Sequence, residues 1–286
     1  MKLGFNQATA SGCKDHSMMA DLEACEKYGF DYVDIRFDVL EEYLKEHTAK
    51  ELADWFMNHH LKPGSYSALL DCNWRKTSDE KKALVDEVNN LLPTLKAIGI
   101  KTICCVPSFN ITGEPTVQEI IDDTAENLNT IANLAEPFGI DLSLEPIGSF
   151  TCSVSRWDIA VKIIEKVNRD NVGLAFDYFH FYATGSNIKD LKNCDGRKIN
   201  NFHLNDCEDL PVGAPYFTDA KRLWPGEGCI NNKEITKVFE KCGFNPKKIT
   251  PSVEIFRPEY YEMTTDENIR IAYEKTKKFA KKFLDF

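Results

Sequence analysis

Short runs rich in β-branched and aromatic residues alternate with longer helical patterns along the chain, and this alternation limits the fold more than any other feature. The eight runs cover residues 3–8, 32–37, 65–70, 102–106, 141–145, 172–177, 200–204 and 249–255. Between them, apolar residues recur at spacings of three, four or seven, as in residues 84–98, which is the pattern of an amphipathic helix. The sequence therefore predicts an α/β fold in which strands and helices alternate.

Several predicted helices carry recognisable ends. Thr48, Thr116 and Ser155 each stand three residues before an acidic residue, which is the spacing of a capping box. Glycines at positions 29, 99, 139 and 243 fit helix C-caps, and Pro93 predicts a kink or a break in its helix. Because no Gly/Ser-rich linker or low-complexity tract interrupts the pattern, we expect a single domain over residues 1–286.

The amino-acid composition argues against several classes of binding partner. Lys and Arg total 35 against 45 Asp and Glu, and the net charge of -10 disfavours nucleic acids and anionic membranes. The N-terminal segment lacks the apolar core of a signal peptide, and no stretch reaches membrane-spanning length. The ten cysteines include no C-x-x-C pair. We expect a cytoplasmic protein with reduced thiols and a small-molecule substrate, and we leave its oligomeric state open.

Four ionisable residues stand at or near the ends of four consecutive β runs: Glu145, Asp177, His203 and Glu254. An open sheet gathers its site from few strands, whereas a barrel collects side chains from the carboxyl ends of all eight. This placement therefore favours a (β/α)₈ TIM barrel. Three carboxylates and one imidazole at its mouth would suit one divalent metal ion, namely Zn²⁺, Mn²⁺, Co²⁺ or Mg²⁺. The alternative is four separate strand-end charges, each paired with Lys or Arg.

Two further residues are candidates for substrate binding. His180 lies three residues after Asp177, on the loop side of the predicted site, and the alternative is a histidine packed among its aromatic neighbours. Arg222 precedes the turn residues of KRLWPGEG and could point inward at substrate hydroxyls, or else be a solvated surface arginine.

The order E...DxxH...H...RxxPGxG...E resembles the xylose isomerase-like barrels, which include ketose 3-epimerases and hydroxypyruvate isomerase. The segments MKLGFNQAT, NRDNVGLAFDYFHFYATGSNI, RLWPGEG and VEIFRPEYY are most similar to the inosose isomerases (2-keto-myo-inositol isomerases) of inositol catabolism. The resemblance implies one divalent metal on the four residues above, His180 and Arg222 near the substrate, and Glu145 and Glu254 as acid and base. The epimerases carry another acidic residue soon after the first glutamate, and PIGSFTCS has none.

The expected reaction is a metal-dependent isomerisation of a polyhydroxylated ketone. A carboxylate removes the proton between a carbonyl and a hydroxyl, and reprotonation of the cis-enediolate moves the carbonyl. Six aromatic residues could face a substrate at the mouth: Tyr66, Trp74, Phe109, Phe179, Trp224 and Phe256. The alternatives are a ketose 3-epimerase or hydroxypyruvate isomerase, a zinc apurinic-site endonuclease, which would need more ligands and a basic surface, and a non-catalytic sugar-binding barrel.

Overall fold

Eight parallel strands close into a barrel in the computed structural model, which describes residues 1–214 and 216–284. The strands follow one another around the barrel in sequence order, and the first pairs with the last. They are β1 (Gly4–Asn6), β2 (Tyr32–Arg36), β3 (Lys62–Leu69), β4 (Thr102–Cys105), β5 (Asp141–Leu144), β6 (Val172–Asp177), β7 (Ile199–Leu204) and β10 (Ser252–Val253). The predicted (β/α)₈ TIM barrel is confirmed.

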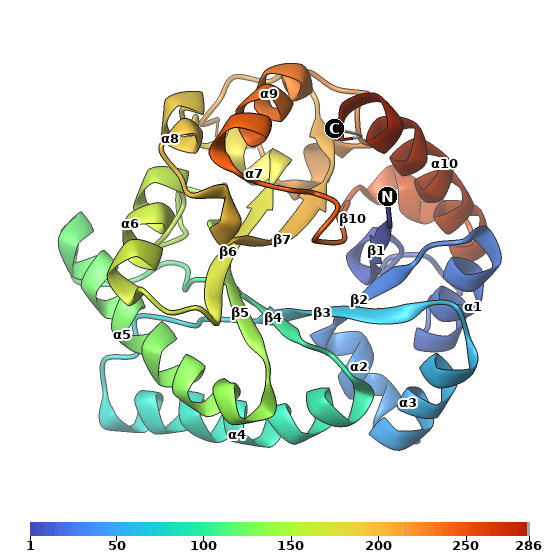
Figure 1. Cartoon of the computed structure of the whole chain (residues 1–286), viewed down its shortest axis with the longest axis horizontal. Helices are drawn as coiled ribbons and strands as arrows, with labels where there is room; N and C mark the ends of the chain where they lie inside the picture. Colours follow the sequence, from blue (N-terminus) through green and yellow to red (C-terminus); the bar gives the residue numbers. More distant parts are fainter. Residues whose placement is uncertain (215, 285–286) are drawn as a thin grey trace.

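The helices form a ring outside the strands (Figure 1). They are α1 (Met18–Tyr28), α2 (Phe37–Tyr43), α3 (Ala49–Asn58), α4 (Ser78–Ile98), α5 (Val117–Ala135), α6 (Trp157–Val167), α7 (Tyr178–Ala183), α8 (Ile188–Lys192), α9 (Asn232–Cys242) and α10 (Thr265–Phe283). Short 3₁₀ turns are η1 (Gln7–Thr9), η2 (Glu136–Phe138), η3 (Gly196–Lys198), η4 (Asp219–Lys221) and η5 (Pro258–Glu262). None of the helices among the described residues is long and apolar enough to cross a membrane.

The largest differences from the predicted strand boundaries are at β3 and β10, and one hairpin was not predicted. β3 begins three residues earlier, at Lys62, and β10 is only two residues long. The hairpin consists of β8 (Asp206–Cys207) and β9 (Arg222–Leu223), which pair antiparallel. Two-residue strands are too short to produce a recognisable alternation of apolar and polar residues.

Two of the three predicted capping boxes are present. The Thr48 and Thr116 hydroxyls each accept a hydrogen bond from the amide of the glutamate three positions later, and each threonine amide donates the reciprocal bond to that glutamate's carboxylate. The box at Ser155 is wrong, because α6 begins after Arg156, which makes no side-chain cap. The Ser155 carbonyl instead accepts a hydrogen bond from the Thr184 hydroxyl at 2.7 Å and belongs to the preceding loop.

Pro93 does not break α4, which is assigned as one helix through this position. Pro93 lies on the exposed side of α4, where a carbonyl that lacks its intrahelical partner can bond to water. The helix then ends as predicted at Gly99, whose φ of 97° is a left-handed conformation that glycine adopts without strain.

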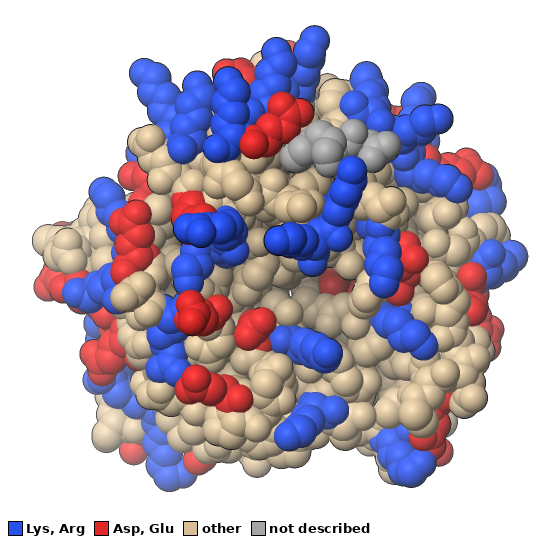
Figure 2. Space-filling view, in the orientation of Figure 1, with Lys and Arg blue, Asp and Glu red and all other residues tan. Residues whose placement is uncertain are grey.

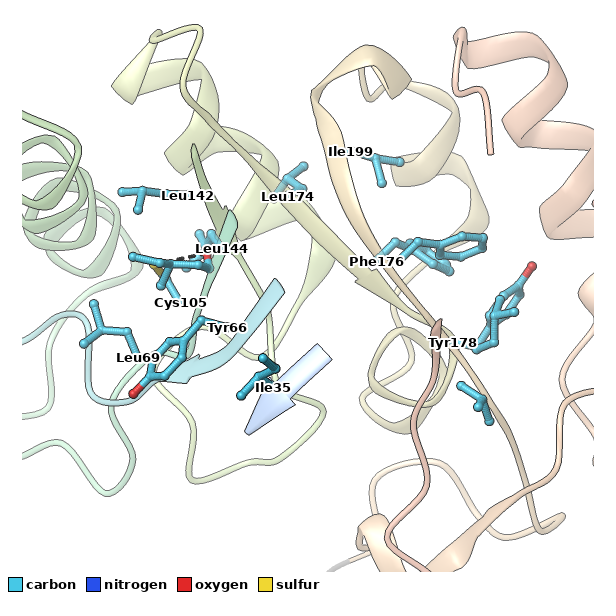
Figure 3. Packing of buried hydrophobic residues seen from close by; sticks show 14 of the residues in the cluster. Ile35, Tyr66, Leu69, Cys105, Leu142, Leu144, Leu174, Phe176, Tyr178 and Ile199 are labelled. Atoms are coloured by element: carbon cyan, nitrogen blue, oxygen red, sulfur yellow. Dashed lines mark hydrogen bonds between the residues drawn. The ribbon is translucent and has the colours of Figure 1, made fainter. Parts of the chain in front are cut away.

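Alternation along the strands divides their side chains between two environments. In β5 and β6, Leu142, Leu144, Leu174 and Phe176 point toward the helices and pack in the main hydrophobic core (Figure 3). Intervening residues such as Ala175 point into the barrel, where a smaller cluster lies. The polar residues that end these strands occupy the same alternate positions as these intervening residues, so their side chains also point into the barrel.

The interior of the barrel has a polar layer below the mouth. Asp34 accepts hydrogen bonds from the Ser65 amide and hydroxyl, at 2.6 and 2.9 Å, and from the Ser252 hydroxyl. All three residues are buried, so these bonds satisfy a carboxylate that would otherwise be costly to enclose.

A hollow of about 630 Å³ opens at the amino ends of the strands, at the opposite end of the barrel from the four candidate residues. Its lining includes Lys62, Lys101 and Lys248. Figure 2 shows the hollow at the centre of this face, with both basic and acidic side chains around its opening.

Candidate metal centre

The barrel brings together the four strand-end residues. Glu145 follows β5, Asp177 ends β6, His203 is the last but one residue of β7, and Glu254 follows β10. All four are buried, and each offers a ligand atom within 4.8 Å of the others. Strand register explains the convergence, because Asp177 pairs with His203 across β6 and β7, and Ser252 pairs with His203 across β10 and β7.

His203 lies between the two glutamates. Its Nδ1 is 2.8 Å from Glu145 Oε1 and 3.4 Å from Glu254 Oε2. Its Nε2 is buried and has no hydrogen-bond partner among the described residues. The Nδ1 atom is therefore the imidazole atom that can join the carboxylates in holding a cation.

The charges of the group are partly balanced by protons. Burial raises the pKa of Glu145, but the charge and hydrogen bond of His203 outweigh burial and lower that pKa to about 2. Burial also lowers the pKa of His203, and here the charges of Glu254 and Glu145 prevail and raise it to about 10. The pKa of Glu254 is raised by burial and by Glu145, despite the opposing effect of His203. An imidazolium thus supplies positive charge where the carboxylates converge.

Arg222 supplies the other positive charge. Its side chain is fully buried, with Nη1 2.9 Å from Asp177 Oδ2 and 3.0 Å from Glu254 Oε2. Its Nη2 contacts His180 Nε2 at 2.9 Å and Asp219 Oδ1 at 2.7 Å. Arg222 is thus not a solvated surface residue, and His180 lies beside it on the first turn of α7.

Four residues not singled out in the sequence contact this group. Asn6 donates to Glu254 Oε1 at 2.9 Å, and the Cys104 thiol donates to Glu145 Oε2 at 3.0 Å. Asn205 donates to Asp177, and Asp219 pairs with Arg222. For Asn6 and Asn205 the available signal was a polar residue at or just after the end of an apolar run.

The six aromatic candidates lie in three kinds of environment. Phe179 and Phe256 lie against the Arg222 guanidinium, with ring centroids 5.0 and 5.2 Å from its central carbon. Tyr66 packs in the core, and Trp224 is buried in a stack on Tyr260. The remaining two are Trp74, which has the Lys76 ammonium over its ring, and Phe109, which is exposed.

The donor set fits a single divalent cation. Three carboxylates and one imidazole, all buried and close together, are ligands for hard or borderline metals such as Zn²⁺, Mn²⁺, Co²⁺ and Mg²⁺. The three buried carboxylates require compensating positive charge, and the protonated His203 and the buried Arg222 supply it. A bound cation would remove that requirement and release the His203 proton.

Comparison with known proteins agrees with the fold. The model of a family described as a xylose isomerase-like TIM barrel matches residues 22–279. The chain belongs to this family. It is 41% identical to an inosose isomerase of Bacillus velezensis, over 99% of this chain and 98% of that protein. It is 40% identical to an inosose isomerase of Bacillus subtilis, over 99% of both chains.

Two solved structures extend this comparison. A crystal structure of the IOLI protein with a zinc atom has a TM-score of 0.93 and 38% identity, and each chain covers all of the other. A D-psicose 3-epimerase crystallised with D-fructose has a TM-score of 0.78 at 17% identity, again over both full chains. The second similarity concerns the fold alone.

Proposed function

We propose that this protein is a metal-dependent inosose isomerase that interconverts 2-keto-myo-inositol and 1-keto-D-chiro-inositol. The observation that carries the proposal is the buried group of four ligand residues, in a chain 40–41% identical over 99% of its length to inosose isomerases. The carbonyl moves to the neighbouring carbon in this reaction. The site must therefore remove a proton from one carbon and return a proton to the next.

The cofactor in this proposal is one divalent cation held by Glu145, Asp177, His203 and Glu254. When bound, such an ion would polarise the ketone and a neighbouring hydroxyl, which acidifies the C–H between them. Zinc is the first metal to test, because a zinc atom is present in the similar IOLI structure. Mn²⁺, Co²⁺ and Mg²⁺ are suited to the same oxygen-rich donor set.

We assign proton transfer to Glu145 and Glu254, which follow β5 and β10 and lie on opposite sides of the adjacent strands β6 and β7. One glutamate, as the carboxylate, removes the C–H proton to give a cis-enediolate, and the other, in its protonated form, delivers a proton to the adjacent carbon. The proton of the neighbouring hydroxyl moves to the former carbonyl oxygen, so that the carbonyl changes place with the hydroxyl. Each has one oxygen near His203 and its other oxygen hydrogen-bonded, to Cys104 or to Asn6. These bonds restrict both carboxylates to defined orientations, as proton transfer requires.

Arg222 and His180 are assigned to substrate binding. The Arg222 guanidinium stays positively charged, because burial is outweighed by Asp177, Asp219 and Glu254, which raise its pKa further above its ordinary value. His180 Nδ1 is buried without a partner among the described residues, so it remains available to a substrate oxygen. Together they can stabilise the negative charge that develops on the enediolate oxygens.

The metal assignment is tested by substitution of its ligands. Asp177→Asn and His203→Ala should each lower zinc affinity at least tenfold and abolish turnover, because each removes a donor from a group of four. Elemental analysis of the dialysed proteins gives occupancy, and chelator competition gives affinity. Full zinc occupancy in the double variant would refute the ligand set.

The reaction is tested by isotope exchange and by a substrate panel. Turnover of 2-keto-myo-inositol in heavy water should place deuterium next to the carbonyl, and Glu145→Gln or Glu254→Gln should stop both turnover and exchange. A panel of ketohexoses and hydroxypyruvate should give kcat/KM values below that for 2-keto-myo-inositol. A value at least tenfold above it for any of them would replace the proposed substrate.

A further inference from the structure

Asn205 lies where three segments of the site meet. Its side chain is fully buried. Its Nδ2 donates to Asp177 Oδ2 at 2.6 Å and approaches the Glu254 carbonyl at 3.4 Å, while its Oδ1 accepts from the Phe179 amide at 2.7 Å. A carboxylate only accepts and a backbone amide only donates, so these partners allow one orientation of the side-chain amide.

The hydrogen bond from Asn205 restricts the Asp177 carboxylate. Asp177 Oδ1 accepts from the His180 amide at 2.7 Å, and Oδ2 accepts from both Asn205 and Arg222. Arg222 belongs to the β8–β9 hairpin, whereas Asn205 directly follows β7. Of the two side chains that donate to Asp177 Oδ2, Asn205 is therefore the one held in place by a barrel strand.

The same amide fixes the start of α7. Phe179 and His180 are the second and third residues of this helix, and the Phe179 amide is bonded to Asn205 Oδ1. His180 in turn reaches Arg222 through its Nε2. Any shift of Asn205 would consequently displace a candidate metal ligand and a candidate substrate contact together.

We propose that Asn205 is a positioning residue. It orients Asp177 for metal binding, and it also holds the start of α7, and with it His180, in a fixed position relative to Asp177. The inference rests on the proposed function, because it takes Asp177 to be a metal ligand. Residues that orient metal ligands in this way typically change metal affinity by about 10- to 100-fold when they are substituted.

The test compares zinc affinity in variants of the full-length protein, by competition with a chelator of known affinity. Asn205→Ala and Asn205→Leu both remove the amide, and leucine also refills the space if alanine impairs folding. Each should weaken zinc binding by about 10- to 100-fold. At saturating zinc, kcat/KM for 2-keto-myo-inositol should remain reduced, because α7 has lost the hydrogen bond at its start.

Asn268→Ala is the matched control. Asn268 is also fully buried and donates to a backbone carbonyl, that of Tyr260 at 3.1 Å, but it lies on α10. Its loss should lower the unfolding temperature and leave zinc affinity within twofold of the wild-type value. Thermal unfolding of all metal-free variants separates a loss of stability from a loss of affinity.

Two different failures can be distinguished. If Asp177→Asn weakens zinc binding but a folded Asn205→Leu protein retains wild-type affinity within twofold, the positioning role is refuted and the ligand set stands. If Asp177→Asn itself leaves zinc affinity unchanged, the proposed ligand set is wrong and the inference falls with it.

Discussion

Arg222→Met removes the positive charge that three acidic side chains share, while a long unbranched side chain remains to pack against Phe179 and Phe256. Two of the three ion pairs are buried, and the third, with Asp219, has an acidic side chain that is 43% exposed. Removing one partner of a buried pair typically costs about 3–5 kcal/mol, because it leaves charge without compensation. The metal-free variant should therefore lose stability of this order.

Thermal unfolding measures this loss. In a protein of this length about 1 kcal/mol corresponds to a shift of roughly 2 °C, so the metal-free variant should unfold about 6–10 °C below the wild type. Saturating zinc should recover part of the difference, because the cation replaces the missing positive charge and stabilises the state that binds it.

Arg257→Met is the control for this experiment. Arg257 pairs with Glu208 and Glu259, and its side chain is 14% exposed. These acidic partners are at the surface, so the substitution should cost less than about 1 kcal/mol. Two results would contradict this reasoning: an unfolding temperature of metal-free Arg222→Met no lower than that of Arg257→Met, or a smaller stabilisation by zinc than in the wild type. Either would show that Arg222 does not compensate the buried carboxylates of the site.

Three further outcomes follow from the same structure. Because the pKa of His203 is raised to about 10, zinc must displace its proton below that pH, so zinc affinity should rise about tenfold per pH unit from 7 to 9. Calorimetry in two buffers should detect about one proton released, whereas an affinity that does not change with pH would show that His203 is already neutral in the metal-free protein. Phe176→Ala should lower the free energy of unfolding by about 3–5 kcal/mol, since this ring is fully buried among aromatic side chains, while Phe150→Ala, at a 67% exposed position, should leave it nearly unchanged in urea titration. Thr48→Ala should cost about 1 kcal/mol through loss of a capping box, and an equal cost for Ser155→Ala would contradict the observed start of α6.

The hairpin β8–β9 is a part of the fold that the sequence pattern did not predict. Each of its strands is two residues long, and Arg222 is buried by contacts with residues far away in the chain. The sequence offered only the turn residues after Arg222 and a choice between an inward and a solvated side chain. Asp219 was missed although its partner Arg222 is only three residues away, because the sequence of the loop does not show that this pair lies at the site.

The sequence alone determined the number and order of the barrel strands and the strand-end positions of Glu145, Asp177, His203 and Glu254. These features are local: a buried parallel strand is apolar, and a polar residue at its end stands out against it. Tertiary structure decided which atoms meet. Pairing of β1 with β10 closes the barrel, and on that ring Asn6 reaches Glu254 while Asn205 joins Asp177 to α7. Such contacts depend on strand register and side-chain direction across the ring, which no local pattern of residues encodes.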